Sequence, residues 1–179
     1  MKTELFNIMK NYLSEQLPCS VGEIGTHKAR TASQIINFLS PRIENLHYTG
    51  YDVFDFAVDN IKFNKSERNG KNGAPYNEAK NKLEQLAKKY KNFSYELHKG
   101  FTTETLVTSK IFDFVYIDAG HSYESVKHDY SMVKDSKLII FDDVQIPGVK
   151  KLIDELVSAD INIELVKTPS KHIWAVIKN

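Results

Sequence analysis

The chain has 179 residues, of which 41% are hydrophobic and 26% charged, as expected for one soluble globular domain covering residues 1–179. Its formal net charge of +1 provides no overall field that would attract nucleic acid or an anionic membrane, so neither is an expected partner. A single cysteine excludes an internal disulfide, and there is no transmembrane-length apolar stretch or signal-peptide core, so we expect a cytoplasmic protein.

The hydrophobic period changes repeatedly between that of a helix and that of a strand. In chain order we expect a helix within 1–18, a strand at 21–25, a helix at 31–39, a strand at 48–52, a helix at 77–90, a strand at 93–97, a helix at 102–108, a strand at 112–118, a helix at 122–134, a strand at 137–141, a helix at 148–158, and strands at 161–166 and 173–177. Residues 59–76 interrupt this alternation with a polar stretch that we expect to form a lid-like loop.

The last two predicted strands are joined by a turn too short to hold a crossover helix, which predicts an antiparallel hairpin. The earlier strands alternate with helices, which predicts parallel pairing and helices on both faces of the sheet. The expected fold is therefore α/β: a Rossmann-like, doubly wound, mostly parallel seven-stranded sheet with a C-terminal antiparallel hairpin.

Carboxylates follow two of the apolar strands directly. Asp118 ends the run at 112–117, and Asp142 and Asp143 end the run at 138–141. Ligands of open α/β sheets bind beyond the carboxyl ends of the strands, so these acids should converge on one crevice. Carboxylates that lie close together repel one another unless one is protonated or a cation lies between them, which points to a functional site.

The loop after the first strand begins at Gly25 and has only one of the three glycines of a dinucleotide-binding fingerprint, so it suits pyrophosphate poorly. Residues 23–31, Glu-Ile-Gly-Thr-His-Lys-Ala-Arg-Thr, instead resemble the first motif of the class I S-adenosylmethionine-dependent methyltransferases, whose sheet also ends in a hairpin. Ala29 stands where that motif has a second glycine, and its methyl group is tolerable if the local φ is negative. A plain strand-to-helix turn is the alternative interpretation.

The resemblance implies an S-adenosylmethionine site. Gly25 would let the backbone pass close to the methionine part, and Thr31, at a helix start, would receive its carboxylate. Asp52, at the end of the second strand, would accept both ribose hydroxyls. The implied cofactor residues are Glu23, Gly25, Thr26, His27, Thr31, Asp52, Val53, Gly100, Phe101 and Asp118. A turn glycine is the alternative for Gly100, and a core position for Phe101.

Residues 112–124 closely resemble the fourth-strand signature of small-molecule O-methyltransferases of the catechol, caffeoyl-coenzyme A and macrolide-sugar types. In those families the acid that ends this strand binds a divalent metal, with two further ligands at the end of the fifth strand. The resemblance therefore implies Mg²⁺, or Mn²⁺, held by Asp118, Asp142 and Asp143. In the metal-free alternative, Asp118 contacts the cofactor amine and Asp143 caps the following loop.

His121 lies three residues after Asp118, where the catechol-type enzymes carry a catalytic lysine, and we expect these two residues to be catalytic. The histidine would act as a general base. Alternatively, it orients an acid or simply begins the helix capped by Ser122.

The resemblance implies metal-assisted O-methylation of a small hydroxylated molecule. A metal-independent N- or O-methyltransferase and a non-catalytic cofactor-binding module stay as alternatives. With so small a lid, the pocket is either open or completed by a second subunit of a homodimer.

Overall fold

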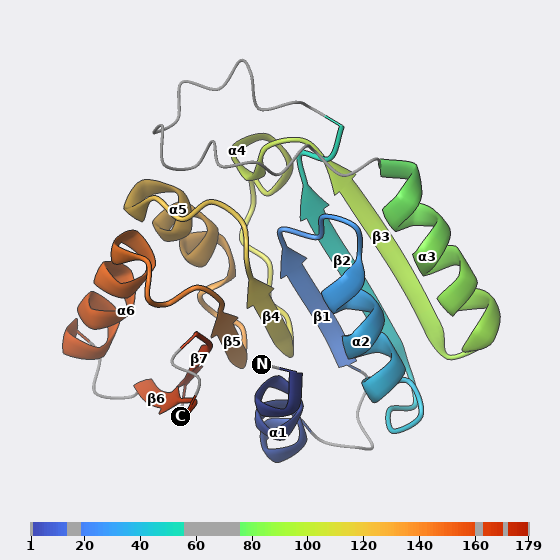
Figure 1. Cartoon of the computed structure of the whole chain (residues 1–179), viewed down its shortest axis with the longest axis horizontal. Coiled ribbons are helices and arrows are strands. Elements are labelled where there is room, and N and C mark those ends of the chain that lie inside the picture. The colour runs from blue at the N-terminus through green and yellow to red at the C-terminus, as the bar shows by residue number, and fades with distance from the viewer. Residues whose placement is uncertain (1, 14–18, 56–75, 160–162, 170–171, 179) are drawn as a thin grey trace.

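The computed structural model describes residues 2–13, 19–55, 76–159, 163–169 and 172–178, which form a seven-stranded sheet with helices on both faces (Figure 1). The strands are β1 (Cys19–Ile24), β2 (Leu46–Asp52), β3 (Phe93–Lys99), β4 (Phe114–Ile117), β5 (Leu138–Phe141), β6 (Ile163–Lys167) and β7 (Trp174–Lys178). The helices are α1 (Lys2–Tyr12), α2 (Arg30–Leu39), α3 (Tyr76–Lys89), α4 (Thr102–Thr105), α5 (Tyr123–Val133) and α6 (Pro147–Ala159).

The strands lie in the order β3-β2-β1-β4-β5-β7-β6. Strands β1 to β5 pair in parallel, whereas β7 runs antiparallel to both of its neighbours, β5 and β6. This arrangement confirms the predicted mostly parallel sheet with a C-terminal hairpin. The register pairs Phe141, at the end of β5, with Trp174, at the start of β7. The end of β6 and the start of β7 therefore lie at the same edge of the sheet as the carboxyl end of β5.

The core is divided into two layers because successive side chains of a strand point to opposite faces of the sheet. In β4, Phe114 and Tyr116 pack with α1, α2 and α3, whereas Val115 and Ile117 pack with α5 and α6. All four are buried, which explains why this strand is apolar throughout instead of alternating with polar residues. The N-terminal helix α1 packs its apolar residues Leu5, Ile8 and Met9 on the domain, and Met9 is fully buried.

Strand β4 begins at Phe114, later than predicted, because Asp113 has a separate anchoring role. The Asp113 carboxylate accepts hydrogen bonds from the Ser20 backbone N–H at 2.8 Å and from the Lys137 ammonium at 2.5 Å. These contacts lower the pKa of Asp113 against the opposing effect of its partial burial. The acid thus ties the beginnings of β1, β4 and β5 together at the edge opposite their carboxyl ends.

Two predicted features fall largely outside the described residues. The lid-like loop at 59–76 lies there except for Tyr76, which begins α3, and so does the end of the helix expected within 1–18. Among the described residues, no helix is long and apolar enough to cross a membrane.

Candidate cofactor and catalytic site

The loops that follow β1, β2, β4 and β5 meet at the carboxyl edge of the sheet, where the arrowheads of β1, β2 and β3 point upward in Figure 1. Backbone hydrogen bonds continue past the strand ends. The Asp118 N–H donates to the Ile24 carbonyl at 2.8 Å, and the Asp142 N–H donates to the Ile117 carbonyl at 3.0 Å. The predicted convergence of the strand-end acids on one edge is therefore present in the backbone.

The packing of the loop after β1 against the loop after β4 requires glycine at position 25. Its φ is +100°, and a Cβ atom added there would lie 2.0 Å from the Asp118 carbonyl oxygen. The Gly25 N–H donates to the Tyr51 carbonyl at 2.8 Å, which holds the loop close to β2. Any larger residue would have to separate β1 from β4.

Ala29 adopts a left-handed conformation with a φ of +52°, so the condition stated for tolerating its methyl group, a negative φ, is not met. It occupies the N-cap position of α2 without a side-chain capping hydrogen bond. This conformation costs a non-glycine residue about 1–2 kcal/mol. The methyl group is fully buried in the core layer packed against α2. Its burial stabilises the fold by about 0.8 kcal/mol, which offsets part of that cost.

Asp52 links the β1 loop to the β2 loop. Its Oδ2 accepts the His27 N–H at 2.7 Å, and its Oδ1 accepts the Phe54 N–H at 2.6 Å. His27 and Phe54 both have positive φ values, so the carboxylate stabilises two loops in uncommon conformations. Each carboxylate oxygen can accept a second hydrogen bond, and Asp52 and Val53 are only half-buried, so the acid remains reachable by hydroxyl groups.

Beneath this loop lies a buried chain of three polar side chains. The Tyr48 hydroxyl donates to Glu23 Oε2 and lies 3.1 Å from Thr26 Oγ1. Burial raises the pKa of the Glu23 carboxyl to about 8; the Tyr48 hydrogen bond opposes this shift, and the nearby Asp118 and Asp52 charges support it. Glu23 is therefore largely a neutral acid at pH 7, and it supports the loop from inside the core.

The remaining predicted cofactor residues lie on α2 and on the loop after β3. Thr31 is in the first turn of α2, whose leading N–H groups have no partner within the helix. Gly100 has a φ of +144° and donates its N–H to the Asp52 carbonyl at 3.0 Å, which brings this loop against the end of β2. Phe101 is half-buried and forms the N-cap of α4. The roles of these residues toward a cofactor stay predictions.

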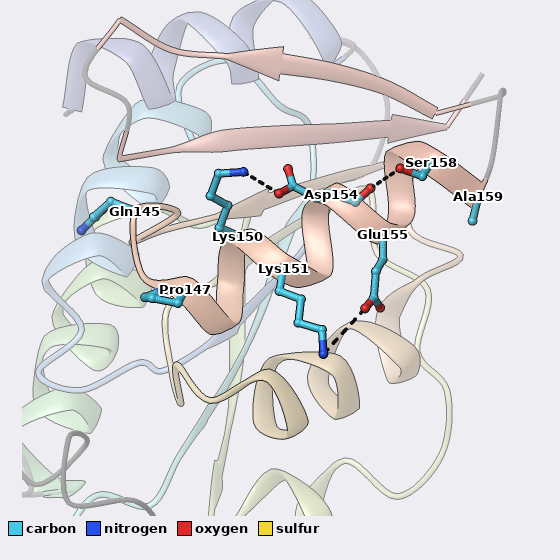
Figure 2. Close-up of a pocket in the computed structure, with 8 residues that line it drawn as sticks. All are labelled: Gln145, Pro147, Lys150, Lys151, Asp154, Glu155, Ser158 and Ala159. Atoms are coloured by element: carbon cyan, nitrogen blue, oxygen red, sulfur yellow. Dashed lines mark hydrogen bonds and ion pairs between the residues drawn. The ribbon is translucent and has the colours of Figure 1, made fainter.

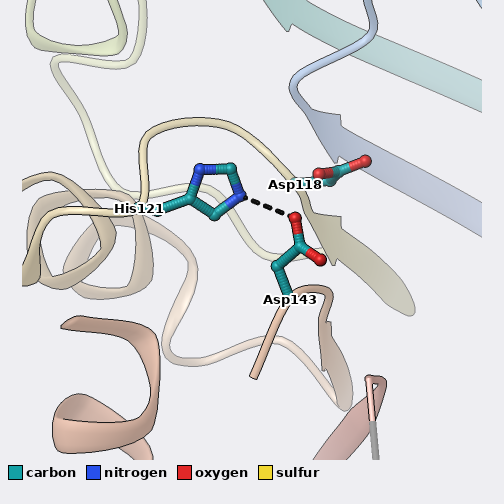
Figure 3. Close-up of side chains that lie close together, drawn as sticks. All are labelled: Asp118, His121 and Asp143. Carbon is teal, nitrogen blue, oxygen red and sulfur yellow. Dashed lines mark ion pairs between the residues drawn. The ribbon is translucent and has the colours of Figure 1, made fainter. Parts of the chain in front are cut away.

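Three side chains from the two loops that follow β4 and β5 lie close together (Figure 3). One ligand atom each from Asp118, His121 and Asp143 lies within 4.8 Å of the others. His121 Nε2 is 3.2 Å from Asp143 Oδ2, and both side chains are only partly exposed, at 24% and 35%. The group offers two carboxylate oxygens and one imidazole nitrogen to a cation, or a histidine oriented by an acid.

The structure does not bring Asp142 into this group. Its Oδ2 accepts the Tyr116 hydroxyl, its Oδ1 accepts the Asp143 N–H at 2.8 Å, and the residue is only 7% exposed. Burial raises the pKa of Tyr116, and the adjacent Asp142 charge adds to the effect, so its hydroxyl stays a donor. Asp142 and Asp143 are consecutive; the Asp142 side chain turns inward, whereas that of Asp143, whose φ is +52°, lies beside His121.

The loop that carries His121 is tightly packed from both sides. Ser122 caps α5 by accepting the Ser125 N–H at 3.2 Å, as predicted. A Cβ atom added at Gly148, in the first turn of α6, would lie 2.3 Å from the His121 carbonyl oxygen. The close approach of α6 therefore limits where His121 can lie.

Gln145 and His172 also belong to this region, although the sequence reasoning passed over both. Gln145 Nε2 donates to Asp143 Oδ1 at 2.9 Å, and His172 Nδ1 lies 3.0 Å from Gln145 Oε1. The only available signal was the position of Gln145 two residues after Asp143.

An open groove of about 770 Å³ runs along α6 (Figure 2). Its charged side chains pair with one another along the helix, Lys150 with Asp154 and Lys151 with Glu155. A second hollow, of about 440 Å³, lies beside Cys19 and Phe93 at the opposite edge of the sheet. Neither hollow is lined by Asp52, Asp118 or His121. The candidate site is therefore identified by the polar groups that lie close together and not by a cavity.

The sequence matches no protein-family model and gives no significant match to a curated protein. Solved structures, in contrast, match almost the whole chain. A Staphylococcus aureus protein described as caffeoyl-CoA O-methyltransferase-like is 17% identical with a TM-score of 0.60, over 99% of this chain and 82% of that one. A precorrin-6y C5,15-methyltransferase from Geobacter metallireducens is 14% identical with a TM-score of 0.58, over 98% and 89%. A methyltransferase from Podospora anserina with bound S-adenosylhomocysteine is 12% identical with a TM-score of 0.56, over 99% and 77%. The chain therefore has the fold of the class I S-adenosylmethionine-dependent methyltransferases.

Proposed function

We propose that this protein is an S-adenosylmethionine-dependent methyltransferase. The observation that carries the proposal is the position of Asp52, which ends β2 and connects the loops after β1 and β2 through the His27 and Phe54 N–H groups. Its remaining lone pairs suit a pair of ribose hydroxyls. The structural neighbours, which include methyltransferases acting on different acceptors, support the cofactor more than any one acceptor.

The surrounding residues fit the rest of the cofactor. The first turn of α2, with Thr31, presents N–H groups and the positive end of the helix dipole to a carboxylate. Val53, which follows Asp52, and Phe101, which follows Gly100, are half-buried apolar residues, and an adenine ring would be held beside them. Glu23 contributes indirectly, because it supports the loop through Tyr48.

We further propose that a divalent cation assists methyl transfer to the oxygen of a small hydroxylated molecule. Asp118, His121 and Asp143 fit such an ion, because a ligand atom of each lies within 4.8 Å of the others. This mixed set of oxygen and nitrogen favours a first-row ion such as Mn²⁺ over Mg²⁺, which takes oxygen ligands. When bound, the cation would lower the pKa of the acceptor hydroxyl. Asp142 would contribute by holding the Asp143 backbone in place.

Metal-independent transfer is the second candidate, and the contact between His121 and Asp143 favours it. A carboxylate beside Nε2 holds the imidazole in place electrostatically, and a neutral imidazole can act as the general base that takes the acceptor's proton. The same two side chains therefore serve either reaction, and only the dependence on a cation separates the two.

Two assays, each run with and without Mn²⁺, test the proposal. The first is calorimetric titration with S-adenosylmethionine, and the second measures methyl transfer to a panel of hydroxylated aromatic compounds. Cofactor binding with Mn²⁺-dependent transfer is the expected result, and transfer that withstands chelation supports the second candidate. Binding without transfer to any acceptor class would favour a non-catalytic module. A properly folded protein that binds no S-adenosylmethionine would contradict the proposal.

A further inference from the structure

The loop after β5 is joined to the β6–β7 turn by two hydrogen bonds. The Val144 N–H donates to the His172 carbonyl at 3.1 Å, and His172 Nδ1 lies 3.0 Å from Gln145 Oε1. Gln145 Nε2 in turn donates to Asp143 Oδ1 at 2.9 Å, and Asp143 Oδ2 lies 3.2 Å from His121 Nε2. These contacts form one continuous chain from the C-terminal hairpin to the candidate catalytic histidine.

The Asp143 carboxylate determines the direction of the two hydrogen bonds made by the Gln145 side chain. An ionised carboxylate only accepts, so Gln145 must present its NH₂ group to Asp143 and its carbonyl oxygen to His172. His172 must therefore carry its hydrogen on Nδ1. The opposite orientation of the amide would place two acceptor oxygens against each other at 2.9 Å.

Gln145 also decides which oxygen of Asp143 faces the site. Because Gln145 occupies Oδ1, Oδ2 is the oxygen directed at His121. The φ of +52° at Asp143 is uncommon for a residue with a side chain, so surrounding contacts must hold this conformation. The hydrogen bonds from Gln145 to Asp143 and to His172 provide such contacts.

We infer that Gln145 and His172 are positioning residues, which hold the Asp143 carboxylate so that one oxygen faces His121 or a cation bound beside it. The catalytic consequence of this inference rests on the proposed function, because Asp143 belongs to the proposed site. The positioning itself does not, since it concerns only contacts within the protein.

The contact is tested first by the tautomer of His172, measured by ¹⁵N NMR of the full chain above the histidine's titration range. The wild-type protein should show the Nδ1–H tautomer. The substitution Gln145→Met keeps the length of the side chain but removes both hydrogen bonds, so His172 should shift to the Nε2–H tautomer usual for a solvated imidazole. Gln85→Met, at an exposed position of α3, is the matched control and should leave the tautomer unchanged.

The catalytic consequence is tested by kinetics. Gln145→Met should lower kcat about 3- to 10-fold, the equivalent of one net hydrogen bond, with little change in KM for S-adenosylmethionine. His172→Leu should have a smaller effect in the same direction, and His172→Asn should restore the rate, because its amide N–H occupies the place of Nδ1–H. The double variant Gln145→Met/His172→Leu should be no worse than Gln145→Met alone.

An Nε2–H tautomer in the wild-type protein, or one unaffected by Gln145→Met, would overturn the inference. Equal rates for His172→Leu and His172→Asn, both below wild type, would also overturn it, since the hydrogen bond would then be irrelevant. A wild-type protein that transfers no methyl group refutes the proposed function alone, because the NMR measurement needs neither an acceptor nor a cation.

Discussion

Glu23 should make the stability of this protein fall as the pH rises from mildly acidic to mildly basic values. The carboxyl is buried, and its pKa is raised from an ordinary 4.5 to about 8, chiefly by that burial. A group whose pKa is higher in the folded state stabilises the fold fully below its unfolded pKa, and this contribution disappears as the pH rises through the folded pKa. The substitution Glu23→Gln removes the ionisation but keeps an acceptor for the Tyr48 hydroxyl.

The magnitude follows from the interval between the two pKa values. At about 1.36 kcal/mol per pH unit, the interval from 4.5 to about 8 corresponds to about 5 kcal/mol of unfolding free energy. Glu23→Gln should therefore differ little from wild type at pH 5, and should be the more stable protein by several kcal/mol at pH 9. The charges of Asp118 and Asp52 contribute to this interval, so variants at either residue should reduce it.

Urea denaturation of both proteins between pH 5 and pH 9, without cofactor, measures the difference. Glu124→Gln is the matched control, because Glu124 is exposed on α5 and its variant should stay within about 0.5 kcal/mol of wild type at every pH. Parallel curves of stability against pH for wild type and Glu23→Gln would refute the reasoning, since they would mean that Glu23 ionises normally inside the core.

Three further predictions concern the site. Asp52→Ala should weaken S-adenosylmethionine binding by about 1–3 kcal/mol in calorimetry. The control Asp55→Ala, which removes an exposed acid paired with Lys99, should not weaken it. Equal losses of binding free energy in the two variants would remove Asp52 from the site. Mn²⁺ should raise the midpoint of thermal unfolding, because an ion that binds only the folded state stabilises it by mass action. Asp143→Asn should abolish this increase, whereas the control Asp154→Asn, on the exposed face of α6, should preserve it. An increase retained in Asp143→Asn would contradict the assigned ligands. Ala29→Gly should change the unfolding free energy by less than about 1 kcal/mol, because relief of the left-handed φ and loss of a buried methyl nearly cancel. A loss above about 2 kcal/mol would show that the Ala29 conformation carries no strain.

The sequence alone was sufficient for the fold class and for the order of helices and strands along the chain, because hydrophobic periodicity is a local property. The apolar runs at 112–117 and 138–141 identified strands buried on both faces, and the short connection before Trp174 required an antiparallel hairpin. The insertion of β7 between β5 and β6 could not be read from periodicity, since it depends on pairing between distant segments. The same holds for Asp113, whose contacts with Ser20 and Lys137 shorten β4.

The sequence also assigned the candidate site acids to one edge of the sheet, because the carboxyl ends of parallel strands share that edge. It could not decide which way each side chain points. Asp142 turns to Tyr116 in the core, while Asp143 lies beside His121. His172 is 27 residues beyond Gln145 and reaches it only because β7 pairs with β5. Local sequence patterns thus predicted the helices and strands and showed which acids follow the strands. Which of those side chains lie in contact was decided by backbone conformation and strand pairing, because both depend on the whole fold.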